Sequence, residues 1–122
     1  TSVLIANKIN KARLSVGKKI CVLASSDFNH FETPEMGFKK DQFVVEKIKK
    51  MDTTGIEREI NTKFITVCGY GPIMSLMEYT KIMDDHPEIN ILKRGHSGEV
   101  YPSDTVVDYI SVLFSSKYIN NE

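Results

Sequence analysis

A carboxylate and an imidazole lie three residues apart in the segment Ser25-Ser26-Asp27-Phe28-Asn29-His30. Asp27 can accept a proton or orient a neighbouring side chain, and His30 can exchange a proton near neutral pH. The two residue types at this spacing therefore predict proton-transfer chemistry. A structural alternative stays open, in which Asp27 caps a turn and His30 is a partly exposed loop residue, because one Asp-x-x-His match is weak evidence.

A second group of candidate residues is Cys68-Gly69-Tyr70-Gly71-Pro72. Pro72 fits the first turn of a helix, so Cys68 would face the positive end of a helix dipole, which favours a thiolate. A thiolate there suits a nucleophile or a soft metal ligand, and Tyr70 could donate a hydrogen bond beside it. The alternative is an inert, buried cysteine, with the glycines serving close packing.

The remaining histidines give weaker signals. His96 lies between two glycines, where it could line a pocket or simply face solvent, and His86 precedes a proline in a loop. A catalytic Cys–His–Asp triad is disfavoured, because no recognisable nucleophile elbow surrounds Cys68. The candidate site is therefore Asp27, His30 and Cys68, with Tyr70 and His96 as further pocket residues.

These residues depend on the elements that flank them. Residues 19–25 form an apolar run that predicts a parallel strand buried on both faces, with Asp27 at its carboxyl end, where open α/β sheets build their sites. Residues 27–38 are expected to be a loop broken by Pro34 and Gly37. The other expected elements are helices at 3–14, 40–49, from Asp52 and from Pro72, strands at 89–93 and 105–114, and a fraying polar tail from Ser115.

The alternation of helices and strands predicts an α/β fold with a central mixed or parallel sheet flanked by helices. Three strands are few for such a sheet, and the first expected element is a helix with no strand before it. We therefore expect residues 1–122 to be a single unit whose sheet is completed by a missing part or by a partner chain.

The composition excludes several classes of protein. Sixteen basic and sixteen acidic residues cancel, so no net field favours nucleic acid or an anionic membrane. No apolar run approaches the roughly 20 residues that span a bilayer. Cys21 and Cys68 lie far apart without zinc-knuckle spacing or a disulfide framework, and the N-terminus lacks signal-peptide features. Together these features predict a reduced, cytoplasmic protein.

Three motifs in this order resemble one known family: Leu23-Ala24-Ser25-Ser26-Asp27-Phe28-Asn29-His30-Phe31-Glu32, Val67-Cys68-Gly69-Tyr70-Gly71-Pro72-Ile73 and Ser97-Gly98-Glu99-Val100. Their order and spacing resemble the C-terminal half of the Memo family, which includes archaeal and bacterial Memo-like proteins and the eukaryotic Memo adaptor. That family is similar to the catalytic subunits of class III extradiol dioxygenases.

The resemblance implies a cleft at the strand ends that holds histidines, an aspartate and a cysteine. His30 matches the acid–base histidine, Cys68 the third metal-site residue, and Asp27 a carboxylate that orients a histidine or lines the cleft. The resemblance places two further histidines in an N-terminal half that this sequence does not contain. A transition metal (iron, copper or zinc) is therefore expected only if those histidines are supplied, and none is expected in this chain alone.

A purely structural subunit would explain the missing half most simply but would leave the motifs at Asp27, His30 and Cys68 unexplained. Two other functions remain open at this stage, and the sequence does not decide whether the protein is an enzyme. The first is metal-dependent redox chemistry, although a thiolate in place of the dioxygenases' carboxylate favours copper or zinc over iron and puts ring cleavage in doubt. The second is a non-catalytic adaptor that binds a peptide, phosphorylated or small-molecule ligand in the same cleft. Either function needs the missing N-terminal half or a partner chain.

Overall fold

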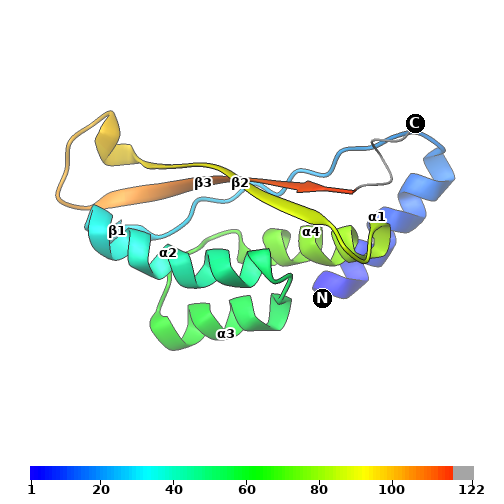
Figure 1. Cartoon of the computed structure of the whole chain (residues 1–122), viewed down its shortest axis with the longest axis horizontal. Helices are drawn as coiled ribbons and strands as arrows, with labels where there is room; N and C mark the ends of the chain where they lie inside the picture. The colour runs from blue at the N-terminus through cyan, green and yellow to red at the C-terminus, as the bar shows by residue number, and fades with distance from the viewer. Residues whose placement is uncertain (117–122) are drawn as a thin grey trace.

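The computed structural model describes residues 1–116 (Figure 1). The polar tail was expected to fray from Ser115, which is wrong for the first two residues, because Ser115 lies in a strand and Ser116 is buried. The rest of that tail, from residue 117 onward, lies outside the described residues. The described elements follow in the order α1 (Ser2–Val16), β1 (His30–Glu32), α2 (Pro34–Lys49), α3 (Thr53–Lys63), α4 (Tyr70–Met83), β2 (Glu88–His96), the 3₁₀ turn η1 (Ser97–Glu99) and β3 (Val106–Ser115).

Several helix boundaries follow local sequence signals. Gly17 ends α1 in the left-handed conformation, with φ of 65°, as the sequence predicted. Asp52 caps α3 as expected, and its carboxylate accepts a hydrogen bond from Gly55 N at 2.9 Å. The predicted loop over 27–38 is wrong from residue 30 onward, because His30–Glu32 form β1, Thr33 caps α2 and Pro34 occupies the first turn of that helix.

The strands form a three-stranded sheet in the order β1-β3-β2. Both pairs, β1 with β3 and β2 with β3, are antiparallel, whereas the sequence favoured parallel or mixed pairing. For β2 and β3, the physical reason is the short connection through η1, which turns the chain back alongside itself. The α/β class is confirmed, with helices packed on a sheet.

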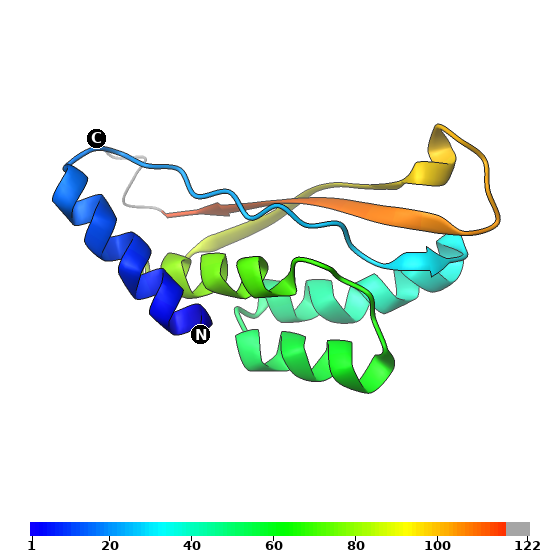
Figure 2. The same cartoon turned by 180° about the vertical axis from the view of Figure 1, so that it is seen from behind.

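The described helices lie on one face of the sheet (Figures 1 and 2). Helices α2 and α4 lie against this face, α3 packs beneath them, and α1 packs on α4 near one end. The apolar core forms between these layers and includes residues such as Phe28, Val44, Ile56 and Met77. Ile110 and Val112 of β3 point toward it, while Tyr109 and Leu113 are about half exposed on the opposite face.

The predicted buried strand over 19–25 is wrong. This segment is extended and runs beside β3, but it is not part of the described sheet (Figure 2). Side chains alternate along it: Val22 and Ala24 are partly buried, whereas Cys21 is exposed and Leu23 is 87% exposed. A continuous apolar run indicates burial on both faces, but in residues 1–116 only one face of this segment has a layer to pack against.

Candidate functional site

Asp27, His30 and Cys68 come together although 38 residues separate the last two in sequence. One ligand atom from each, an oxygen, a ring nitrogen and a sulfur, all lie within 4.8 Å of one another. His30 Nε2 is 3.7 Å from Asp27 Oδ2, too far for a direct hydrogen bond but close enough for an ion pair when the imidazole is protonated. The Asp27 side chain is 48% exposed and Cys68 is exposed, so the group opens to solvent.

Thr66, rather than Asp27, orients the His30 ring. His30 Nδ1 lies 2.7 Å from the carbonyl oxygen of Thr66, and His30 N donates to Thr66 Oγ1 at 2.7 Å. A carbonyl oxygen can only accept, so Nδ1 carries the hydrogen, and Nε2 of the neutral ring keeps a lone pair directed at the other two residues. This arrangement suits either a general base or a metal ligand.

Asn29 connects the two segments of the site. Its side chain is buried, and its Oδ1 accepts hydrogen bonds from both Thr66 N and Thr66 Oγ1 at 3.2 Å. Sequence reasoning assigned no role to Asn29 or Thr66. Asn29 lies within the motif that holds Asp27 and His30, but nothing in the spacing shows that its partner is 37 residues away.

The close approach of residues 25–26 to the start of α4 places Cys68. Gly69, the N-cap of α4, donates from its backbone N to Ser26 Oγ at 2.8 Å. A Cβ at Gly69 would lie 2.5 Å from Ser26 Cβ, so only glycine allows this contact. Cys68 Sγ then lies 3.9 Å from both Ser26 Oγ and the carbonyl oxygen of Asp27. The expectation that a glycine here serves close packing is confirmed at Gly69.

The three side chains fit a transition metal in type. Thiolate, imidazole and carboxylate are all ligands of zinc, and the first two also suit copper. Ligand atoms about 2.0–2.3 Å from a tetrahedral ion lie about 3.5 Å from one another. The three atoms, which lie within 4.8 Å of one another, would therefore have to move closer together to bind one ion. The group offers at most three protein ligands from the described residues and leaves the remaining positions to other groups.

Tyr70 and His96 are placed differently. Tyr70 is the first residue of α4 and packs partly buried against the apolar core. His96 ends β2, opposite Asp108 of β3 in the strand register. Neither belongs to the group formed by Asp27, His30 and Cys68, and their roles as pocket residues stay predictions.

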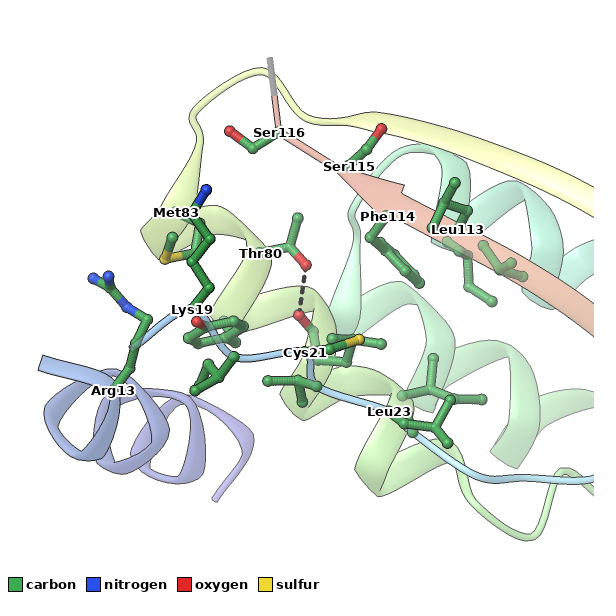
Figure 3. Close-up of a pocket in the computed structure, with 18 of the residues that line it drawn as sticks. Arg13, Lys19, Cys21, Leu23, Thr80, Met83, Leu113, Phe114, Ser115 and Ser116 are labelled. Atoms are coloured by element: carbon green, nitrogen blue, oxygen red, sulfur yellow. Dashed lines mark hydrogen bonds between the residues drawn. The ribbon is translucent and has the colours of Figure 1, made fainter. Parts of the chain in front are cut away.

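A cavity of about 800 Å³ lies next to the site rather than in it. It opens between the extended segment, α1, α4 and the end of β3, where Figure 3 shows Lys19, Cys21 and Leu23 with Phe114 on the opposite side. Ser26 is the lining residue that also contacts the site, through its hydroxyl near Cys68 Sγ. The cavity is mainly apolar, so it suits side chains or an apolar ligand rather than an ion.

The sequence model of the family described as Memo-like protein matches residues 1–113, nearly the whole chain. The chain belongs to the Memo-like family. The matched range includes Asp27, His30 and Cys68, the three residues that the structure brings together.

Curated Memo-like relatives are similar to the chain over most of its length. A MEMO1 family protein of Desulfurococcus amylolyticus is 42% identical over 109 residues, which are 89% of this chain and 36% of that protein. The relative from Saccharolobus solfataricus is 41% identical over 81% of this chain and 34% of its own length, and that from Sulfolobus acidocaldarius is 38% identical over 90% and 38%. The chain therefore spans about a third of the length of the relatives it matches.

Within residues 1–116, no helix combines the length and the apolar character needed to cross a lipid bilayer.

Proposed function

We propose that the chain supplies one side of a metal-dependent redox site. Cys68 would be the metal ligand from this chain, and His30 would exchange a proton at Nε2. Asp27 would stabilise the imidazolium that forms when His30 accepts the proton. The observation that carries this proposal is the 4.8 Å grouping of the three ligand atoms, with Nδ1 of His30 already committed to Thr66 O.

A bound transition metal would supply Lewis-acid or electron-transfer chemistry that no side chain of this site offers. The residues of the chain have separate tasks. Thr66 holds the ring so that Nε2 points at the opening, and Gly69 and Ser26 hold the cysteine backbone against the segment that carries Asp27. The site is preorganised by backbone contacts, which keeps its geometry before any ligand arrives.

The remaining metal ligands would come from the two thirds of the family-length protein that have no counterpart here, or from a partner chain. Two features support a missing neighbour. The extended segment 18–27 belongs to no described sheet and exposes Leu23, and the face of the sheet away from the helices exposes Tyr109 and Leu113. Exposed apolar groups gathered on one face are typical of an interface.

The alternative is a non-catalytic module that binds a peptide or phosphorylated ligand in the same place. Asp27 argues against phosphate, because its carboxylate would repel an anion next to His30. The thiol of Cys68 would also have no evident task in such a site. The metal function is therefore the better supported of the two.

The test is titration with Co²⁺, whose thiolate bond gives a strong near-ultraviolet absorption. The chain is titrated alone and after mixing with the portion of the Desulfurococcus amylolyticus relative that it does not cover. We expect the thiolate band in the mixture, and much weaker binding or none by the chain alone. Cys68→Ser should remove the band, whereas Cys21→Ser, which removes the other exposed thiol, should leave it unchanged.

The outcomes separate the two functions. A band that survives Cys68→Ser, or no cobalt binding in either sample, would overturn the metal proposal. Saturable binding of a phosphopeptide that persists in a metal chelator and weakens in His30→Ala would favour the adaptor instead.

A further inference from the structure

Two buried carboxyl oxygens without hydrogen-bond partners lie behind the site. They are Oδ2 of Asp41 on α2 and Oδ2 of Asp108 on β3, and within residues 1–116 neither has a partner. The residues are only 1% and 5% exposed. An unsatisfied polar atom at such depth is costly, so this pair needs a physical explanation.

The two carboxyl groups share one location. Asp108 Oδ2 lies 2.2 Å from where a Cβ at Gly37 would be, so the Asp108 carboxyl rests directly on the α2 backbone. Gly37 and Asp41 are four residues apart and lie on the same face of that helix. The Asp108 carboxyl therefore lies one helical turn from Asp41, in the space that Gly37 leaves open.

We propose that Asp41 and Asp108 share one proton, and that this protonated pair positions His30. A proton between the two Oδ2 atoms would give each of them a partner. It would also remove the repulsion between two buried negative charges, which is how paired carboxyl groups behave in other proteins. The inference of a shared proton depends only on the positions of the two carboxyl groups, whereas the role for His30 rests on the proposed function.

The pair holds the backbone before His30 from two sides. Asp41 Oδ1 accepts from Asn29 N at 3.0 Å. The Asp108 backbone bonds to Phe28 N at 2.8 Å and to the carbonyl oxygen of Asn29 at 2.9 Å. Because Asn29 Oδ1 binds Thr66, and Thr66 binds the His30 ring, the path from the pair to the imidazole is continuous.

The electrostatic surroundings agree with a retained proton. Burial is the largest cause, followed by the Asp108 side chain, and together they raise the pKa of Asp41 to about 8, against the opposing effects of the Asn29 amide and Arg94. Arg94 of β2 is held by Gln42 Oε1 and the carbonyl oxygen of Phe38.

Other titratable groups nearby belong to three elements. His96 faces Asp108 across the strand register of β2 and β3. On β1 and α2, Glu32 and Lys40 are paired with each other. An experiment must therefore separate the titration of Asp41 from that of His96 and of the site histidine.

Carboxyl ¹³C NMR on the full chain tests the shared proton directly. We expect one carboxyl of the pair to stay protonated far above the ordinary aspartate range and to ionise near pH 8. Asp104, an exposed aspartate in the loop before β3, serves as the internal reference. Titration of both Asp41 and Asp108 near the ordinary value of about 4 would overturn the proposal.

The positioning role has its own readout, the exchange protection factor of the Thr66 amide, which is corrected for the intrinsic rise of the exchange rate with pH. In the native chain, this protection should fall at least several-fold between pH 6 and pH 9. Asp41→Asn keeps an acceptor for Asn29 N and offers an N–H to Asp108, so it should make the protection of Thr66 insensitive to this range. Asp104→Asn should behave like the native chain.

If Asp41→Asn does not fold, Asp108→Asn serves as the second variant. The carboxyl ¹³C titration of the native chain tests the shared proton without either variant. Unchanged protection of Thr66 across the range in the native chain would exclude the positioning role. If Co²⁺ does not bind but one carboxyl of the pair still ionises near pH 8, the proposed function is wrong and the shared proton stands.

Discussion

The carbonyl oxygen of Thr66 lies 2.7 Å from Nδ1 of His30 and fixes both the tautomer and the direction of the ring. Thr66 is two residues before Cys68, so one short segment orients the imidazole and also delivers the thiol. Asn29 links this segment to the one that carries Asp27 and His30. The site therefore depends on the contact between these two segments more than on any single helix or strand.

Asn29→Ala should be strongly destabilising. It removes the acceptor that satisfies Thr66 N and Thr66 Oγ1, and it leaves a small hole in a fully buried place. We expect a loss of about 2–3 kcal/mol in the free energy of unfolding, measured by urea denaturation. Asn61→Ala, on the exposed side of α3, is the control and should change stability by less than about 0.5 kcal/mol. A loss for Asn29→Ala no larger than that of the control would contradict this account.

Gly69→Ala should damage the site, whereas Gly71→Ala should not. A Cβ at Gly69 would meet Ser26 Cβ at 2.5 Å and the carbonyl oxygen of Ser25 at 2.8 Å, but a Cβ at Gly71 meets no atom within 4 Å. We expect Gly69→Ala to cost at least about 2 kcal/mol and Gly71→Ala to be neutral or stabilising by up to about 1 kcal/mol. Thermal unfolding and Co²⁺ affinity measure the two effects. Equal behaviour of the two variants would show that the close approach at Gly69 is not needed.

The pH dependence of stability should have a definite sign. The pKa of Asp41 is raised in the folded chain to about 8 from an ordinary 3.8, so the folded state binds a proton that the unfolded state releases. This contribution to stability is complete below about pH 4 and is lost as the pH rises toward 8. Chemical denaturation at several pH values should show stability falling over that interval, more steeply in the native chain than in Asp41→Asn.

Arg94→Gln should move the ionisation of the pair to still higher pH. The guanidinium favours the ionised form of Asp41, so its removal raises the pKa of that carboxyl further. The substituted glutamine carries no charge to replace the cation, although its amide can keep contact with Gln42. The carboxyl ¹³C titration measures the shift directly. A midpoint that moves to lower pH would show that Arg94 does not act on Asp41 through its charge.

Leu23→Asp should weaken association with the rest of the family-length protein without destabilising the isolated chain. Leu23 is 87% exposed on the segment beside the uncovered sheet face, so a charge there costs little until a partner covers it. Val100→Asp is a matched control, because Val100 is also 87% exposed but follows η1 at the far end of the sheet. Sedimentation of each variant with the uncovered portion of the Desulfurococcus amylolyticus relative should show at least a tenfold loss of affinity for Leu23→Asp alone. Equal losses for both variants would refute this assignment of the interface.

The amino-acid sequence by itself determined the features that depend on neighbouring residues. Gly17 ends a helix and Asp52 begins one because capping needs only a few consecutive residues, and the β-branched and aromatic residues at 105–114 mark a strand for the same reason. The family motifs also placed Asp27, His30 and Cys68 in one candidate site before any distance was known.

The tertiary structure alone decided what depends on distant contacts. It showed that Thr66 and Asn29 hold the imidazole, that Gly69 is required by Ser26, and that Asp41 meets Asp108. It also corrected the strand expected at 19–25, because apolar character reveals that a segment will be covered but not by which part of the protein. Hydrogen bonds and close contacts between residues far apart in the chain exist only once the helices and strands have packed, so no local pattern records them.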